Sequence, residues 1–293
     1  MKNIIVVTGG AGFIGSNLIE KLLLRTNYKI LSLDNYSTGS KKNHIKSSRV
    51  KYFKGDTKNI ENYFLRYQKN IHALFHLGEF SRIAQSFKFI DELKESNIVG
   101  STSVINFCMK NKIRIIYSAT SAAFGKNFKH QNLSPYAFTK TNILNLILNY
   151  AEWFKLKYNI VYFYNVYGKR QILDNDMAAV IGIFEHCKES GKVIPIVSPG
   201  TQSRIFTHID DIVDACIQSL KNKKIKHMLI KAKQSHSIIK VAKMFNNKYR
   251  FVKPRKGERF ASSAPKSIRG LKIKIYVGKK KLSDYILNKY KNY

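Results

Sequence analysis

A glycine-rich turn near the amino terminus limits the fold of this chain more than any other feature. The segment VVTGGAGFIGSNL follows an apolar, β-branched run at 3–8 and opens an amphipathic stretch at 13–25. Gly9, Gly12 and Gly15 suit a tight strand-to-helix turn, because they let a diphosphate approach the backbone and let the helix pack closely on the strand. N–H groups at the start of that helix favour phosphate. The pattern predicts a βα unit that binds a dinucleotide.

An acidic residue at the end of the next apolar run supports this prediction. Asp34 closes the run 29–34 and follows Gly15 by 19 residues, where a carboxylate can bind the diol of an adenosine ribose. No basic residue follows until Lys41, so nothing nearby is placed to receive a 2′-phosphate. Together these features favour NAD over NADP as the cofactor.

The first half of the chain alternates short apolar runs with longer amphipathic stretches. We expect strands at 3–8, 29–34, 50–53, 73–77, 113–118 and 160–166, and helices at 13–25, 57–69, 97–111 and 136–155. Continuous apolar strands that alternate with helices predict an α/β fold with a doubly wound parallel sheet of the Rossmann type.

After Gly168 the expected elements become shorter and less regular. Helices are expected at 176–190, 209–220, 237–245 and 281–290, with a strand at 192–197. We therefore predict a Rossmann domain at 1–168 that binds NAD and carries the catalytic groups, and a smaller α/β substrate-binding lobe at 169–293. Elements of one part can cross to the other.

The chain is strongly basic, with 52 Lys and Arg against 18 Asp and Glu, which gives a net charge of +34. From Lys221 to Tyr293 the sequence has 23 basic residues, and its acidic residues are Glu258 and Asp284. Such a field attracts polyanions, whether nucleic acid, an anionic membrane surface or a nucleotide-linked substrate. Lys outnumbers Arg 41 to 11 and aromatic residues do not alternate with basic ones, which favours a solvated lysine-rich surface over a dedicated nucleic-acid site.

Hydropathy and cysteine usage bear on the expected location of the protein and on disulfide or metal sites. No apolar run approaches the roughly 20 residues that span a bilayer, and the amino terminus reads as a strand rather than a signal peptide, so we expect a soluble, cytoplasmic protein. Cys108, Cys187 and Cys216 are odd in number and far apart, so neither disulfides nor a zinc site is expected. We assign no metal.

The segment LSPYAFTK places Tyr136 and Lys140 four positions apart, on one face of an expected helix. Ser134 and Pro135 are typical of an N-cap and a first helical position, so Tyr136 is expected in the first turn, where the helix dipole favours negative charge. An unperturbed tyrosine has a pKa of about 10 and needs a nearby cation to act as a base near neutrality. Tyr136 and Lys140 are therefore a candidate base and the cation that tunes it.

Several motifs occur together and in order: TGGAGFIGS, LDNYSTG, GD at 55–56, HLG at 76–78, SPYAFTK and YNVYGKRQ. As a set they resemble the extended short-chain dehydrogenase/reductases, specifically the NAD-dependent sugar-nucleotide epimerase/dehydratase family, which includes UDP-glucose 4-epimerase-like enzymes. The resemblance runs to about Asp214 and implies catalytic roles for Thr120, Tyr136 and Lys140, with Lys140 also on the nicotinamide ribose. It implies cofactor contacts at Gly9, Gly12, Phe13, Ile14, Gly15, Asp34, Asn35, Asp56, Thr57, Leu77, Gly78, Glu79, Asn97, Tyr136 and Lys140.

The resemblance also implies contacts to a UDP- or GDP-linked sugar. The matching positions are Thr120, Asn165, Arg204 and Arg255, and the two arginines suit the geometry of a diphosphate. The chain departs from the family pattern at three positions: Ile205 replaces a usual Asp, Tyr162 stands where an Arg is common, and Glu79 stands where a small residue is usual. We expect Glu79 to be either an exposed residue at the rim of the site or a polar contact special to this branch.

The two residues after Thr120 bear on the reaction. Dehydratases of the family carry an Asp-Glu pair there and decarboxylases typically carry a Glu two positions on, whereas this chain has Ser121 and Ala122. The resemblance therefore favours a nucleotide-sugar 4-epimerase that oxidises C4 to a keto intermediate and reduces it again. The alternatives are a net NAD-dependent 4-dehydrogenase or reductase and, less favoured, a basic polyanion-binding protein on an old enzyme scaffold. The family also implies a homodimer formed through the helices at 97–111 and 136–155.

Overall fold

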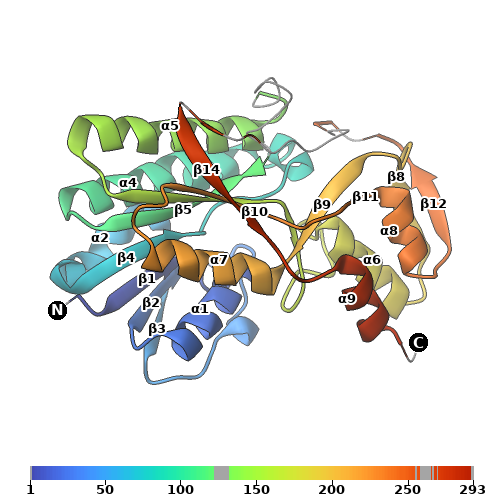
Figure 1. Cartoon of the computed structure of the whole chain (residues 1–293), viewed down its shortest axis with the longest axis horizontal. Helices are drawn as coiled ribbons and strands as arrows, with labels where there is room; N and C mark the ends of the chain where they lie inside the picture. Colours follow the sequence, from blue (N-terminus) through green and yellow to red (C-terminus); the bar gives the residue numbers. More distant parts are fainter. Residues whose placement is uncertain are drawn as a thin grey trace.

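A nine-stranded sheet forms the centre of the described part of the molecule (Figure 1). The structure is a computed structural model that describes residues 2–121, 132–254, 256–257, 265, 267–268 and 270–291. The strands lie in the order β13-β14-β10-β6-β5-β4-β1-β2-β3. Their bounds are β1 (Ile4–Thr8), β2 (Lys29–Asp34), β3 (Val50–Lys54), β4 (Ile71–His76), β5 (Arg114–Thr120), β6 (Tyr158–Phe163), β10 (His227–Lys231), β13 (Ser267–Ile268) and β14 (Leu271–Val277). All neighbouring pairs except β13–β14 are parallel, which confirms the predicted doubly wound fold.

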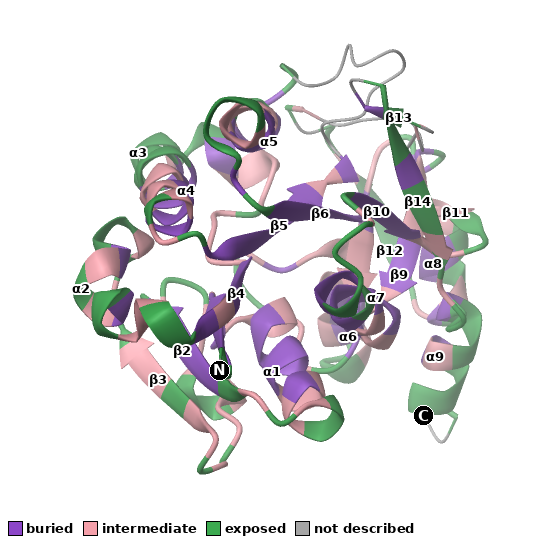
Figure 2. Cartoon of the chain, turned by 60° about the vertical axis from the view of Figure 1, so that its left-hand side comes forward, coloured by how far each residue is buried: buried purple, intermediate pink, exposed green. Residues whose placement is uncertain are grey.

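Helices cover both faces of this sheet. Helices α1 (Phe13–Arg25) and α7 (Ile209–Lys221) lie on one face, and α2 (Ile60–Phe64), α4 (Ser101–Lys110) and α5 (Pro135–Phe154) lie on the other. Each face of the sheet packs against its helices in a separate apolar core, and strand β1 contributes to both. Ile4 and Val6 pack towards α4 and α5, whereas Ile5 and Val7 pack towards α1 and α7. Figure 2 shows the resulting band of buried strands between helices. Burial on both faces explains why these strands are continuous apolar runs in the sequence.

The prediction of a single helix at 57–69 is wrong. That segment consists of a 3₁₀ turn η2 (Thr57–Asn59), the short helix α2 and a second 3₁₀ segment η3 (Leu65–Asn70). The backbone leaves the α region at Asn59 (φ −104°, ψ 25°) and at Phe64 (φ −122°, ψ −4°), so the hydrogen-bond pattern changes twice although the apolar side chains still face the sheet. Further short elements are η1 (Lys41–Asn43), η4 (Ala84–Phe87), α3 (Ile90–Leu93) and the π-helical η5 (Lys94–Gly100), which leads into α4.

A smaller lobe lies beside the main sheet. It contains a three-stranded sheet of β11 (Ser235–Ser237), β9 (Ser203–His208) and β7 (Asn165–Tyr167), and a pair formed by β12 (Tyr249–Val252) and β8 (Ile194–Val197). Helices α6 (Val180–Glu189), α8 (Ile238–Met244) and α9 (Leu282–Lys289) pack on these strands around a separate apolar core that includes Phe184, Phe206 and Phe245.

Four described elements that follow residue 168 return to the main sheet. Helix α7 contributes to the same core as α1, β10 pairs with β6, β14 pairs with β10, and β13 pairs with β14. In β14 the lysines Lys272 and Lys274 are exposed on either side of the buried Ile273. The division into a domain at 1–168 and a lobe at 169–293 stays a prediction. In the structure, elements from the second range belong to the main sheet and its helical layer. None of the helices in the described residues has the length and apolar character needed to cross a membrane.

Candidate active site

A cavity of about 1020 Å³ lies at the carboxyl ends of β1, β4, β5 and β6, where the main sheet faces the smaller lobe. This is the edge at which open parallel sheets bind their ligands. Within the described residues, the predicted site residues that line the cavity are Gly9, Gly12, Phe13, Ile14, Gly15, Asp34, Asn35, Asp56, Thr57, Leu77, Gly78, Glu79, Thr120, Tyr136, Lys140, Asn165 and Arg204. Residues that are distant in the sequence therefore meet in one place.

The glycine turn is built for close approach to the backbone. Gly9 has φ +71°, and a Cβ there would lie 2.8 Å from the main-chain nitrogen of Gly78. A Cβ at Gly15 would lie 2.1 Å from the carbonyl oxygen of Gly9. Helix α1 begins after Gly12, and no described side chain caps its first turn. The turn therefore leaves N–H groups for a diphosphate at the positive end of the helix, which fits NAD.

Asp34 is fixed beside that turn by two main-chain groups. Its Oδ2 accepts a hydrogen bond from the Ala11 nitrogen at 2.9 Å, and its Oδ1 accepts one from the Tyr36 nitrogen at 2.8 Å. Burial raises the pKa of the Asp34 carboxyl, and these two donors oppose that shift. The carboxylate thus lies on the cavity wall at the end of β2, where an adenosine ribose is expected.

Three other predicted cofactor residues have distinct surroundings. The Asn35 amide donates to Asp56 Oδ1 at 2.8 Å, which links the ends of β2 and β3 at the cavity wall. Asn97 is buried and does not line the cavity, and it instead holds the backbone of Phe80 through bonds of 2.7 and 3.0 Å. Asn97 therefore lies behind the wall and positions it.

The helix that carries Tyr136 and Lys140 starts as the sequence predicts. Ser134 is the N-cap of α5 and accepts a hydrogen bond from the Ala137 nitrogen at 3.1 Å, with Pro135 at the first helical position. The Tyr136 nitrogen, left over in the first turn, donates to Ser86 Oγ at 3.2 Å. Both Tyr136 and Lys140 face the cavity.

The side chain of Glu79 is buried rather than exposed at the rim. Its carboxylate forms an ion pair with Lys140, and the two side chains are only 3% and 5% exposed, respectively. Lys140 Nζ also donates to the carbonyl oxygen of Ser118 at 2.5 Å. Burial lowers the pKa of the Lys140 ammonium, and the neighbouring Glu79 opposes that shift.

The remaining predicted residues come from β5 and the smaller lobe. Thr120 ends β5, and the buried Ser121 follows it. The Asn165 amide donates to the carbonyl oxygen of Ile205 at 2.9 Å, and Arg204 Nη1 donates to that of Ser203 at 2.9 Å. Both Asn165 and Arg204 line the cavity, whereas Ala122 and Arg255 lie outside the described residues.

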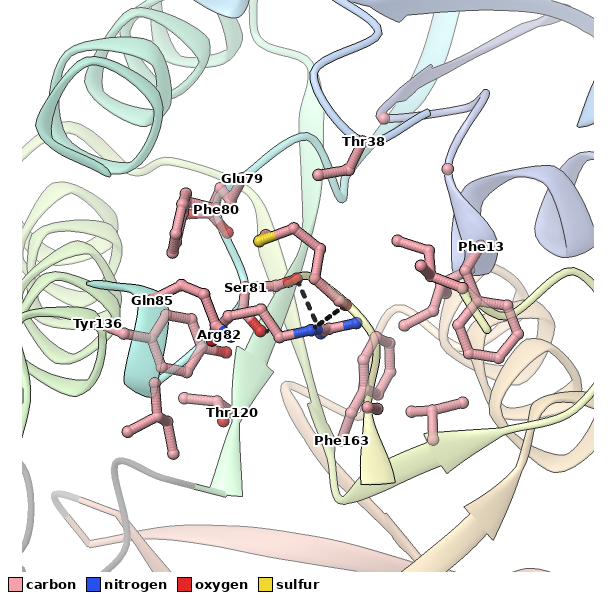
Figure 3. Close-up of a pocket in the computed structure, with 18 of the residues that line it drawn as sticks. Phe13, Thr38, Glu79, Phe80, Ser81, Arg82, Gln85, Thr120, Tyr136 and Phe163 are labelled. Atoms are coloured by element: carbon pink, nitrogen blue, oxygen red, sulfur yellow. Dashed lines mark hydrogen bonds between the residues drawn. The ribbon is translucent and has the colours of Figure 1, made fainter. Parts of the chain in front are cut away.

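Arg82 is a further residue of the cavity wall, and no sequence motif pointed to it. Figure 3 shows its side chain crossing the cavity beside Tyr136. Nε donates to the carbonyl oxygen of Met177 at 2.5 Å, and Nη1 donates to the carbonyl oxygen and the hydroxyl of Ser81 at 3.0 and 3.3 Å. Among the described residues, no carboxylate pairs with this guanidinium. The available signal was an arginine four residues after Gly78 of the HLG segment, in a chain whose usual cation is lysine.

The fold and site define a dinucleotide-binding α/β protein with a hydroxyl, a tyrosine and a lysine beside the cofactor cradle. The chain belongs to the NAD dependent epimerase/dehydratase family, whose model matches residues 5–230. This match confirms the resemblance noted in the sequence and the expectation of NAD as cofactor.

Individual relatives catalyse different reactions. The chain is 30% identical over 243 residues to a UDP-N-acetyl-alpha-D-glucosaminuronate decarboxylase from Bacillus cytotoxicus, covering 76% of this chain and 73% of the relative. It is 29% identical to a dTDP-D-glucose 4,6-dehydratase from Dictyostelium discoideum, covering 72% of this chain but only 54% of the relative. The structure of a UDP-glucuronic acid 4-epimerase from Bacillus cereus, in complex with UDP-glucuronic acid and NAD, is 25% identical and has a TM-score of 0.85 over 98% of each chain.

Proposed function

We propose that this protein is an NAD-dependent nucleotide-sugar 4-epimerase. One observation carries the proposal: Thr120, Tyr136 and Lys140 line the same cavity as the dinucleotide cradle, and Ser121 occupies the position after Thr120 where dehydratases of the family have a carboxylate. The site thus has the groups for oxidation and reduction at a carbinol and lacks that acid.

Each residue has a role in this reaction. Tyr136 removes the proton of the sugar O4 hydroxyl, Thr120 holds that hydroxyl by a hydrogen bond, and the Lys140 ammonium stabilises the phenolate of Tyr136. When bound, NAD supplies the acceptor and then the donor of the hydride at C4. After the keto sugar has turned its other face, Tyr136 returns the proton to O4. Protons and electrons balance over the cycle, so no external oxidant is consumed.

Glu79 is a carboxylate in the cavity wall, but its surroundings do not suit the acid of a dehydratase. An elimination needs a group that delivers a proton to the leaving hydroxyl. Glu79 accepts hydrogen bonds from Ser101 and Tyr117 and pairs with Lys140, so its oxygens are already occupied by donors. This arrangement supports simple redox chemistry over dehydration.

Cations near the substrate end of the cavity support a diphosphate-linked sugar. Arg204 comes from β9 and Arg82 from the segment after β4, and both line the cavity. One guanidinium group can donate two parallel hydrogen bonds to the oxygens of a phosphate. The nucleotide is UDP in the Bacillus cereus structure, and a UDP-linked sugar is accordingly our first choice, with a GDP-linked sugar second.

The test is incubation of the purified protein with UDP-glucose, UDP-galactose, their N-acetyl forms and UDP-glucuronic acid. We expect interconversion of one 4-epimeric pair, without net change in NADH absorbance. No interconversion of any pair would contradict the proposal. Net formation of NADH with a keto product would instead establish the second candidate, a 4-dehydrogenase, and release of CO₂ or of a 4-keto-6-deoxy sugar would establish decarboxylation or dehydration.

We also propose a homodimer formed through η5–α4 and α5. Large apolar side chains are exposed on these helices: Ile98 (40%), Val99 (43%), Phe138 (49%), Trp153 (61%) and Phe154 (54%). Exposed aromatic side chains of this size are enriched at protein interfaces. The dimer and its interface follow from the family resemblance, and this apolar surface supports them.

A further inference from the structure

Glu79 lies in a buried polar network behind the candidate base. Its Oε1 accepts hydrogen bonds from Ser101 Oγ at 2.8 Å and from the Tyr117 hydroxyl at 3.1 Å, while its Oε2 pairs with Lys140. Three donors from β5, α4 and α5 thus converge on one side chain. A carboxylate can accept all three, whereas a neutral carboxylic acid has to donate through one of its oxygens.

The network continues to the cofactor-binding backbone. Thr8 Oγ1 accepts hydrogen bonds from the nitrogens of Leu77 and Gly78 at 3.2 and 3.1 Å, so its own proton is directed to His76 Nδ1 at 2.7 Å. His76 Nε2 then donates to Ser101 Oγ at 2.9 Å, and Ser101 donates to Glu79. Burial lowers the pKa of His76 to about 4, so the ring is neutral near pH 7. Every proton in this chain of bonds therefore points towards Glu79.

This arrangement changes what Lys140 can do for Tyr136. The ammonium lies 4.2 Å from the centre of the Tyr117 ring and is held between Glu79 and the Ser118 carbonyl. Tyr136 is one helical turn before Lys140 and faces the same cavity. The base therefore works beside a cation and an anion together, rather than beside a lone cation.

Other titratable or charged groups surround this site. His76 from β4 and Tyr117 from β5 face Glu79 and Lys140. Arg82, from the segment after β4, faces Tyr136 on α5, and Tyr162 from β6 faces Tyr117. Arg82 keeps its charge over the working pH range, His76 stays neutral there, and burial raises the pKa values of Tyr117 and Tyr162 well above the ordinary value. The groups whose protonation can change activity are therefore Tyr136 and Lys140.

We infer that Glu79 is a positioning residue that keeps Lys140 charged and in place, and thereby sets the pH range in which Tyr136 acts as a base. The inference rests on the proposed role of Tyr136. An anion raises the pKa of a nearby ammonium, because it favours the charged form, and it raises the pKa of a nearby phenol, because it disfavours the phenolate. Activity rises with pH as Tyr136 loses its proton and falls as Lys140 loses its own.

The decisive experiment is the pH profile of kcat/KM for Glu79→Gln, measured on the nucleotide-sugar pair that the wild-type protein interconverts. Loss of the anion lowers both pKa values, so both limbs of the profile move to lower pH by about one unit or more. Glu79→Asp, which keeps the charge, and Tyr117→Phe, which removes one donor to Glu79, leave both limbs in place. A uniform loss of activity in Glu79→Gln with unmoved limbs would overturn the inference, because it would indicate a purely structural role.

A second measurement does not depend on activity, so it separates failure of this inference from failure of the proposed function. Unfolding of Glu79→Gln, Lys140→Met and the double variant is followed by denaturant titration without cofactor or substrate. We expect Glu79→Gln to lower the unfolding midpoint and Lys140→Met to restore part of it, because the buried ammonium is then no longer left without its counter-ion. If Glu79→Gln alone does not fold, recovery of a folded double variant supports the ion pair. Additive losses, or a double variant that does not fold, would overturn it.

Discussion

Arg82 reaches from the main sheet to the smaller lobe, where its Nε donates to the carbonyl oxygen of Met177 at 2.5 Å. Arg82 follows β4, whereas Met177 lies between β7 and α6. The bond therefore places Arg82 at the junction of the two lobes and in the wall of the cavity. Among the described residues, no carboxylate pairs with its guanidinium.

Replacing Arg82 is predicted to weaken nucleotide-sugar binding selectively. Arg82→Gln removes a guanidinium that we expect to bind an anionic group of the substrate, and charged hydrogen bonds contribute about 1.5–3 kcal/mol. We expect KM to rise by about 10- to 100-fold, with NAD affinity unchanged. Initial rates give KM, and fluorescence titration gives the affinity for NADH. Lys88→Gln, an exposed lysine on the same segment, is the control, and an unchanged KM in Arg82→Gln would contradict this role.

Two glycines with positive φ provide a matched test of the cofactor cradle. Gly9 (φ +71°) has no room for a Cβ, whereas Gly191 (φ +67°) has nothing within 4 Å of that position. Gly9→Ala is expected to abolish NAD binding and to lower stability by more than the strain alone. Gly191→Ala carries only the backbone strain, about 1 kcal/mol, and should bind NAD normally. Calorimetric titration with NAD and thermal unfolding of both variants check this, and equal behaviour of the two would contradict the assigned role of Gly9.

Asp34 is predicted to favour cofactor binding at a cost in stability. Burial raises its pKa in the folded protein, so ionisation is easier in the unfolded chain, and the folded state loses stability as the pH rises through the unfolded and then the folded pKa. Asp34→Asn removes this loss. In denaturant unfolding without cofactor, we expect the free energy of unfolding of the variant, relative to that of wild type, to be higher at pH 7 than at pH 4. Its NAD affinity at pH 7 should fall. An exposed control is Asp174→Asn, and NAD binding by Asp34→Asn at the wild-type level would contradict the ribose contact.

The apolar surface of α5 predicts the oligomeric state. Trp153→Ser combined with Phe138→Ser removes two of its large exposed side chains, which are 61% and 49% exposed in the single chain. We expect wild type to be a dimer and the variant to be a monomer by light scattering coupled to gel filtration. Leu24→Ser, at a 75% exposed position on α1, should leave the dimer intact. A monomeric wild-type protein would contradict the proposed interface.

The features that could be predicted from sequence are those that local chemistry decides. The glycine turn, the two-faced burial of β1 and the capping of α5 by Ser134 and Pro135 each depend on a few adjacent residues, so their patterns were readable. The prediction of one helix at 57–69 was wrong, because apolar spacing carries no information on the backbone conformation at Asn59 and Phe64. Spacing alone could not distinguish an α-helix from a mixture of α and 3₁₀ turns.

The contacts of Glu79 and Arg82 were not predictable, because they require elements far apart in the chain to meet. Glu79 contacts residues 22, 38 and 61 positions away, on α4, β5 and α5. Arg82 contacts Met177, 95 positions away in the other lobe. The sequence showed that Glu79 departs from the family pattern, but whether the side chain faced solvent or Lys140 depended on how these elements pack.

The lysines of β14 give the basic charge of the carboxyl-terminal quarter a second effect, on strand pairing at the border of the sheet. This strand lies near one border of the nine-stranded sheet, since its only described neighbours there are β10 and the two residues of β13. A border strand is a template for pairing with another chain, and lysine side chains along it oppose that pairing by charge repulsion and desolvation. Lys272 lies where β14 already pairs with β13, whereas the exposed Lys274 lies beyond that pairing, where its charge opposes the addition of another strand. Part of the charge that would attract a polyanion thus disfavours association between copies of the chain.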